Sequence, residues 1–332
     1  MGATDFPDQP RLAADPRALL RRAWASSRPL AFVGVAMLLT LGATIVGLLL
    51  DPRVITGAPA WLKPAKFAVS ISIYCLTLLW LLTFVRGHPR LVAVVAWGTA
   101  VGLAIEEVII IAQVMRGTTS HFNEATALDG ALFSVMGALV VLVWALNLVT
   151  IVLLLVQRLP NPAFAWALRL GLVVSFAGMA VAFLMIGATP EQLAAAGAAG
   201  DPPIAGAHSV GAQDGGPGLP LVGWSTVAGD LRAGHFVGLH ALQVLPVVGW
   251  LIVRLRPSWL GMRHRVALVC TAGLAYLGLV LLLAWQALRG QPVVAPGAVT
   301  VGVFLALAAA AVVAAAATVL LAWRARQDRT AQ

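Results

Sequence analysis

The chain has 332 residues, of which 60% are hydrophobic and only 11% are charged, and its mean hydropathy is +0.92. Soluble domains carry about 25% charged residues, so this composition excludes an ordinary soluble domain and indicates an integral membrane protein. The net charge of +9 lies in short basic clusters between apolar segments. That placement is typical of a membrane protein, so the expected partner is the lipid bilayer, with no nucleic acid. The sequence predicts neither the small ligand or ion nor the oligomeric state.

The apolar segments predict eight transmembrane helices in an all-α bundle. A polar arm, residues 1–28, precedes a first apolar run that is long enough to span a ~30 Å hydrocarbon core. This run is too long for the apolar region of a signal peptide, so we expect a retained helix. The transmembrane domain then covers residues 29–323 and a short tail covers 324–332. The predicted spans are 29–50, 65–85, 91–115, 128–156, 168–187, 235–253, 266–288 and 298–323.

Basic residues predict the orientation of the bundle. With both termini in the cytoplasm, 16 of the 22 Lys and Arg residues lie on the cytoplasmic side, which satisfies the positive-inside rule at every loop. The protein is therefore predicted to be a multi-pass protein of a bacterial cytoplasmic (inner) membrane. The remaining six basic residues are predicted to lie outside: Arg53, Lys63, Lys66, Arg116, Arg232 and Arg289.

One extracytoplasmic loop, residues 188–234, is much longer than the others and rich in glycine. Thr189, Pro190 and Glu191 have the pattern of a helix start. The rest of the loop has the composition of a mobile segment. Two interpretations stay open: a lid over an outer site, or a plain linker, which the composition favours.

Polar residues in the stretch 104–129 point to a site inside the membrane. Glu106 lies nine residues before Met115, roughly 14 Å below the outer end of its helix, and Glu107 follows it directly. Gln113 shares a face with Glu106, and Asp129 begins the next span. Charged side chains inside the hydrocarbon are costly and usually functional, so we expect a site for protons, ions or a ligand. The alternative is a protonated carboxyl that joins two helices.

Histidines provide the second part of the predicted site. His121 and His235 are each followed by phenylalanine, and the segments 120–129 and 234–243 share four residues when aligned on this pair. A fainter match occurs at Lys66-Phe67, which suggests a parallel repeat of helical hairpins. His240 and Gln243 lie three residues apart on one helical face. Further polar residues at the outer access path are Asn123, Glu124, Asp230 and Arg232.

Motifs do not settle the chemistry. The sequence contains no HExxH, CxxC, Walker A, dinucleotide-binding or GxSxG motif. Haem or a metal ion could bind through His121, His235 or His240, since axial histidines can come from different helices. Eight helices with histidines toward the outer face resemble the haem A synthases in architecture, although the paired motifs of that family are missing here.

Three functions are therefore considered. The first is a proton- or cation-coupled transporter with a buried carboxylate and histidine site in the outer half of the membrane. The second is a membrane redox protein or enzyme that binds haem or a metal through the outer histidines. The third is a membrane scaffold or assembly factor in which the polar groups only hold helices together. Transport is favoured because buried carboxylates fit it without an added cofactor.

Overall fold

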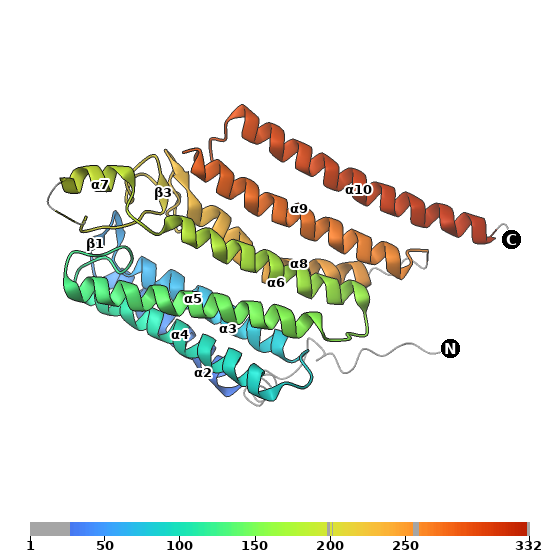
Figure 1. Cartoon of the computed structure of the whole chain (residues 1–332), viewed down its shortest axis with the longest axis horizontal. Coiled ribbons are helices and arrows are strands. Elements are labelled where there is room, and N and C mark those ends of the chain that lie inside the picture. Colours follow the sequence, from blue (N-terminus) through green and yellow to red (C-terminus); the bar gives the residue numbers. More distant parts are fainter. Residues whose placement is uncertain (1–26, 198–199, 201, 255–258, 331–332) are drawn as a thin grey trace.

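The computed structural model describes residues 27–197, 200, 202–254 and 259–330. Within these ranges eight helices are long and apolar enough to cross a membrane, so the predicted all-α, multi-pass fold is confirmed (Figure 1). The spanning helices are α2 (Arg28–Leu50), α3 (Leu62–Leu82), α4 (Pro89–Met115), α5 (Ala127–Leu155), α6 (Pro162–Ala180), α8 (Leu231–Arg254), α9 (Met262–Leu288) and α10 (Ala298–Thr330).

Short elements fill the connections at one end of the bundle. A 3₁₀ helix, η1 (Val181–Met185), extends α6, and the short helix α7 (Pro190–Ala196) begins with a capping box between Thr189 and Gln192. The strands β1 (Val54–Ile55) and β2 (Ala58–Pro59) form one antiparallel pair, and β3 (Ser209–Val210) and β4 (Gly229–Asp230) form another.

The fifth span begins earlier than predicted. Helix α6 starts at Pro162, with Asn161 as its N-cap, rather than near residue 168. Arg169 lies inside this helix, and its guanidinium donates to the carbonyl oxygens of Leu154 and Gln157 at 3.3 and 2.8 Å. A long cationic side chain can bend toward the helix end in this way, so its presence did not mark a loop.

The eight helices form two groups of four with the same packing order (Figure 1). In the first half, α2 packs on α3, α4 contacts both of them, and α5 lies against α4. In the second half, α6 packs on α8, α9 contacts both of them, and α10 lies against α9. The α5–α6 contact joins the two halves, where Trp144 stacks on Phe176 with 4.3 Å between ring centroids.

Helices α4 and α9 carry the clearest sign of an internal repeat. Both have 27 residues and finish with glutamine and two apolar residues, and in both an arginine and a glycine follow the helix. The two glycines, Gly117 and Gly290, have φ values of 76° and 69°, the left-handed conformation that glycine adopts after helix ends. Their shared length, end sequence and backbone turn indicate that the halves are parallel repeats.

Helices α3 and α8 correspond in the same way. Helix α3 begins with Leu62-Lys63 and α8 begins with Leu231-Arg232. Four residues after each leucine comes a similar pair, Lys66-Phe67 in α3 and His235-Phe236 in α8. His235 therefore corresponds to Lys66, the fainter of the two sequence matches. The match of His235 with His121 was wrong in register, because His121 lies in the α4–α5 connection rather than inside a helix.

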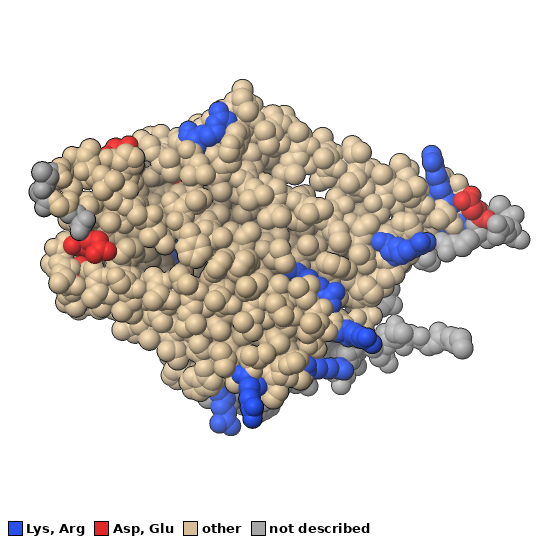
Figure 2. Space-filling view, in the orientation of Figure 1, with Lys and Arg blue, Asp and Glu red and all other residues tan. Residues whose placement is uncertain are grey.

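Charges are distributed unequally between the two ends of the bundle. On the face seen in Figure 2, most Lys and Arg side chains lie toward the end where α10 finishes, whereas carboxylates concentrate at the other end, beside α7. The orientation in which the α7 end faces outward stays a prediction from the positive-inside rule. We call the α7 end the capped end, after the described residues of the segment 186–230, which cover it.

Candidate functional site

The cap is the segment 186–230, and its described residues, 186–197, 200 and 202–230, form a folded layer attached to both halves. It is tied to α8 because Asp230 accepts two hydrogen bonds from the Arg232 guanidinium, at 2.9 and 2.6 Å, and Arg232 also donates to the Gly223 carbonyl at 2.6 Å. It is tied to α3 through Lys66, whose Nζ donates to the Val222 carbonyl at 3.2 Å. Its described part is therefore packed against the bundle by these bonds, and its role as a lid over an outer site stays a prediction.

The cap also contacts the α4–α5 connection. The Ala205 amide donates to the Phe122 carbonyl at 2.8 Å, and the Glu124 amide donates to the Pro203 carbonyl at 2.9 Å. Phe122 is buried, and its ring lies against His208 of the cap at 5.0 Å between centroids. These contacts cover the side chains beneath the cap and hold them away from bulk solvent.

Glu106 and Glu107 are almost completely buried in α4, at 2% and 1% exposure. None of their four carboxyl oxygens has a hydrogen-bond partner among the described residues. Leaving such groups unpartnered costs free energy, so packing alone does not explain why this helix carries them. The pair is the main polar feature of the membrane-spanning region.

His121 connects Glu106 to the cap. Its Nε2 lies 3.4 Å from Glu106 Oε1, close but without hydrogen-bond geometry, and its Nδ1 lies 3.1 Å from Ser120 Oγ. Burial lowers the pKa of His121 well below its ordinary value, and the charges of Lys63 and His208 lower it further. We infer a neutral ring in which Ser120 donates to Nδ1 and Nε2–H points toward Glu106.

Lys63 is a member of the site that the sequence did not single out. It stands in the first turn of α3, where it interacts electrostatically with Glu106, Asp214, Lys66 and Arg232. Among the described residues it makes no hydrogen bond and no ion pair. A cation in the first turn of a helix is unfavourable with respect to the helix dipole, and this is the signal that could have identified it.

His208 and Asp214 are two further members, supplied by the cap. His208 Nδ1 lies 2.6 Å from Asp214 Oδ2, and Asp214 also accepts the amides of His208 and Ser209. Burial lowers the pKa of His208 below its ordinary value although Asp214 opposes the shift. Burial alone would raise the pKa of Asp214, but these hydrogen bonds and the His208 charge lower it. No pattern in the sequence indicated that this loop pair lies near Glu106.

Gln113 and Asp129, which were predicted as site residues, form a clamp between α4 and α5. Asp129 accepts hydrogen bonds from Gln113 at 2.8 Å, from Arg116 at 2.5 Å and from Thr126 at 2.6 Å. Because its oxygens already have donors, Asp129 serves to anchor the start of α5. Two neighbouring predicted residues lie in the same turn: Asn123 is buried and bonds within it, and Glu124 is exposed.

The second-half residues lie along α8. His235 Nδ1 is 2.9 Å from the Gly178 carbonyl of α6, and His235 interacts electrostatically with His208. His240 Nδ1 is 3.2 Å from Gln243 Oε1, and Gln243 donates to Thr77 of α3 at 3.0 Å. This last bond crosses between the halves. Within the described ranges, no hydrogen bond or ion pair joins His240 or Gln243 to Glu106.

The predicted constellation therefore divides into an outer cluster and a deeper link. The outer cluster, beneath the cap, consists of Lys63, Glu106, Glu107, His121, His208 and Asp214. The deeper link consists of Thr77, His240 and Gln243, between α3 and α8. In the part of the chain that the structure describes, no three His, Cys, Asp or Glu residues are grouped so as to hold a metal ion.

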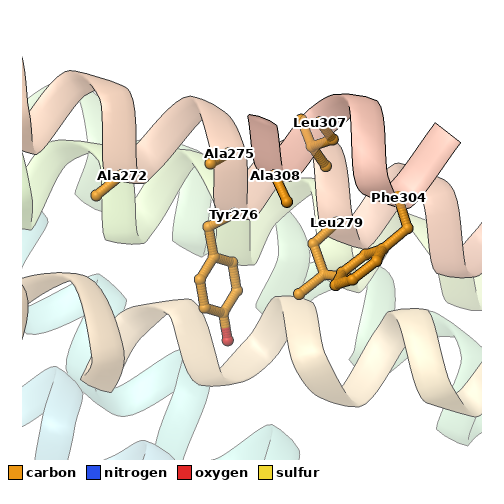
Figure 3. Close-up of a pocket in the computed structure, with 7 residues that line it drawn as sticks. All are labelled: Ala272, Ala275, Tyr276, Leu279, Phe304, Leu307 and Ala308. Atoms are coloured by element: carbon orange, nitrogen blue, oxygen red, sulfur yellow. The ribbon is translucent and has the colours of Figure 1, made fainter. Parts of the chain in front are cut away.

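A crevice of about 250 Å³ lies elsewhere, between α9 and α10. Figure 3 shows its lining of alanine, leucine and phenylalanine side chains, with Tyr276 turned so that its hydroxyl donates to the Val237 carbonyl of α8 at 2.8 Å. Leu279, one of the lining residues, stands at the position in α9 that Glu106 occupies in α4. The hydroxyl of Tyr276 is already bonded to Val237, and the other lining side chains are apolar.

Comparison with known proteins adds no family to this description. The chain matches no protein-family model, no curated protein and no solved structure.

Proposed function

We propose that this multi-pass membrane protein is a proton-coupled transporter of a bacterial cytoplasmic membrane, with both termini inside. The observation that carries the proposal is the Glu106–Glu107 pair, whose four carboxyl oxygens are buried without a hydrogen-bond partner in the described structure. Carboxyl groups in this setting can take up and release protons within the membrane. A purely structural role would favour partners for these oxygens.

The position of the pair relative to the repeat supports this function. Lys63 and Arg232 stand at equivalent places in the two halves, and they interact across the boundary. Thr77 and Gln243 form a second contact across it. In transporters built from repeats, substrate and ion sites lie where the repeats meet, and Lys63 brings one member of the outer cluster close to that boundary.

His121 supplies a path for protons beneath the cap. A neutral imidazole can accept a proton on one ring nitrogen while it releases the proton on the other. Here Nδ1 would accept a proton from the capped end once the Ser120 hydroxyl rotates away, and Nε2 would pass its proton to Glu106, 3.4 Å distant. The ring returns to its first tautomer after it turns or exchanges protons with water.

Transport can be tested in proteoliposomes with a pH gradient and a trapped pH-sensitive dye. Solutes from separate classes, such as small carboxylates, amines and monovalent or divalent cations, are added one at a time. We expect one class to dissipate the gradient with the wild-type protein. The Glu106→Gln/Glu107→Gln variant should no longer dissipate the pH gradient with that solute. Glu191→Gln, in the exposed helix α7, should dissipate it as the wild type does. Equal dissipation by the double variant and the wild type would reject the proposal.

A haem- or metal-dependent function is a second candidate, favoured by one observation. His208, His235 and His240 each have Nδ1 in contact with an oxygen, from Asp214, Gly178 and Gln243 respectively. Histidine ligands usually hold the second nitrogen in this way. A visible spectrum decides: a Soret band lost in His235→Ala or His240→Ala would support haem, and a colourless, metal-free preparation would reject this class.

A further inference from the structure

Lys63 differs from the other cations at the capped end because it makes no hydrogen bond, ion pair or ring contact with any described residue, although it interacts electrostatically with Glu106 and Asp214. Three arginines there are paired with carboxylates, one stacks on a tryptophan ring, and Lys66 donates to a carbonyl oxygen, whereas the structure gives Lys63 no bond within its described ranges. The five partnered contacts are Arg53–Asp51, Arg116–Asp129, Arg232–Asp230, Arg289–Trp285 and Lys66–Val222.

The repeat shows what is missing. Arg232, the counterpart of Lys63, is neutralised by Asp230, two residues before it. The residue two before Lys63 is Trp61, and its indole N–H donates to Asp51 at 2.8 Å. The first half therefore has a cation at the same place as the second half, but no described carboxylate is bonded to it as Asp230 is to Arg232.

The surroundings of Lys63 contain a carboxyl group that also lacks a hydrogen-bond partner among the described residues. Glu106 interacts electrostatically with Lys63, its side chain is 3% exposed, and neither of its carboxyl oxygens has a hydrogen bond. The edges of aromatic rings border this region, since Phe67 lies 5.6 Å from the His121 ring. A cation and a protonatable carboxyl beside aromatic carbon suit a small organic anion.

We propose that the site between Lys63 and Glu106 binds a small solute with one carboxylate group. The carboxylate is the counter-ion of Lys63 and accepts a hydrogen bond from protonated Glu106, in the role that Asp230 has for Arg232. A single negative charge fits because Lys63 is the one Lys or Arg of the outer cluster, it has no ion pair with a described residue, and Asp214 already adds negative charge nearby. The inference rests on the proposed function only for the claim that the bound anion is transported.

Binding of the anion is coupled to proton uptake. An ionised Glu106 would repel the carboxylate, so the bound state favours Glu106 with its proton, and by linkage the anion and the proton promote each other's binding. The charged and titratable groups that face Glu106 are Lys63 on α3, His121 in the α4–α5 connection and Glu107 on α4. This coupling provides the chemistry of a proton–anion symporter.

Calorimetry on the full-length protein in lipid nanodiscs tests the inference. The probes are acetate, pyruvate and benzoate, with benzamide and benzylamine as the neutral and cationic counterparts of benzoate. We expect at least one carboxylate to bind and the amide and amine not to bind. Titration in two buffers of different ionisation enthalpy should reveal uptake of about one proton per anion, falling to near zero in Glu106→Gln, which keeps a hydrogen-bond donor.

Variants of Lys63 separate a site from a structural role. Lys63→Met should weaken carboxylate binding at least tenfold, and Lys63→Arg should retain it within a few-fold. Trp61→Asp, which supplies the carboxylate found in the second half, should also remove binding. Arg289→Gln, at the same end of the bundle, is the control and should bind as the wild type does. Thermal unfolding of each variant identifies any that do not fold.

The possible outcomes distinguish this inference from the proposed function. Failure of all three carboxylates to bind, equal affinity in Lys63→Met, or preferential binding of benzylamine would each overturn the carboxylate site. Carboxylate binding without solute-dependent dissipation of a pH gradient would retain the site and reject transport. Dissipation by another solute class without carboxylate binding would reject this site and retain transport.

Discussion

The two halves of the bundle share one helical plan but differ in chemistry. Glu106 and Glu107 of α4 stand where α9 has Leu279 and Val280. Val280 is completely buried and packs in an apolar cluster with Val174, Ala241 and Leu245 of the second half. The same backbone position therefore accepts either a carboxyl or an aliphatic side chain, and the difference shows that the polar site is a property of the first half rather than of the fold.

The halves also differ in how closely their first two helices pack. A Cβ atom at Gly178 of α6 would lie 2.5 Å from the Gly238 Cα of α8, so these backbones are in direct contact. At Gly34 of α2 the nearest atom is a Leu76 side-chain carbon of α3 at 3.2 Å, a contact that can adjust. Small residues allow such close approach in membranes. We infer that α6 and α8 form the more rigid pair, against which the first-half site is held.

The largest expected effect follows from placing a carboxyl in the second half. Val280→Glu puts an unpartnered polar group where apolar side chains surround it, and we expect it to lower stability by about 3 kcal/mol. Leu279→Glu, which borders the open α9–α10 crevice, should cost less. The thermal unfolding midpoint in detergent measures both. If Val280→Glu unfolded at the same temperature as the wild type, the second half would accept a buried carboxyl at this position as the first half does, and the proposed difference between the halves would be wrong.

An intermediate effect is expected from the equivalent glutamines. Gln113 is buried, donates to Asp129 and accepts from Arg116 at 2.6 Å, whereas Gln286 donates to the Pro292 carbonyl at 2.7 Å. Bonds to charged groups contribute more than neutral ones, so Gln113→Ala should cost about 2 kcal/mol and Gln286→Ala about 1 kcal/mol. Chemical denaturation measures the free energy of unfolding of both variants. A larger decrease in Gln286→Ala than in Gln113→Ala would contradict the role of Gln113 in the clamp between α4 and α5.

The smallest expected effect is the pH dependence of the cap. The pKa of His121 lies well below its ordinary value in the folded protein and that of His208 is also lowered, so both rings bind protons less readily there than in the unfolded segments, which bind them as the pH falls through about 6.5. The unfolded form then binds more protons, so cap stability decreases from pH 7.5 to 5.5. Asp214, whose pKa is lowered, adds a loss only in more acidic solution.

Hydrogen exchange measures this effect after correction for the intrinsic rate. We expect a few-fold faster opening of the described cap amides at pH 5.5 than at pH 7.5, reduced in His208→Gln. The α9–α10 connection, residues 289–297, contains no His, Asp or Glu and should show no such change. A cap that opened equally at both pH values would indicate that the two histidines do not contribute.

The sequence was sufficient for the number and type of helices because hydropathy and length determine which segments cross a membrane. It also located Glu106 and His121, which the structure brings within 3.4 Å of each other. It did not identify Lys63, His208 or Asp214, because the contacts that join them form only when the cap folds over α3 and α8. Residue spacing also could not show that Gln113 and Asp129 form a hydrogen bond with each other.

The repeat was detectable from sequence but not in its correct register. The His-Phe pairs drew attention to His121, whereas the matching ends of α4 and α9, Gln113 to Gly117 and Gln286 to Gly290, carry the stronger similarity. Apolar residues are interchangeable in lipid-facing positions, so few identities persist along the helices. The shared helix lengths, turns and packing order identify the correspondence.

The central claim is that Glu106 and Glu107 bind protons inside the membrane. It is tested most directly by transient currents that follow a pH jump on a solid-supported membrane carrying the oriented protein. Proton binding at a buried site displaces charge, so the wild type should give a transient current that Leu279→Gln retains and Glu106→Gln/Glu107→Gln loses. A current of the same size and pH dependence in the double variant would contradict the claim.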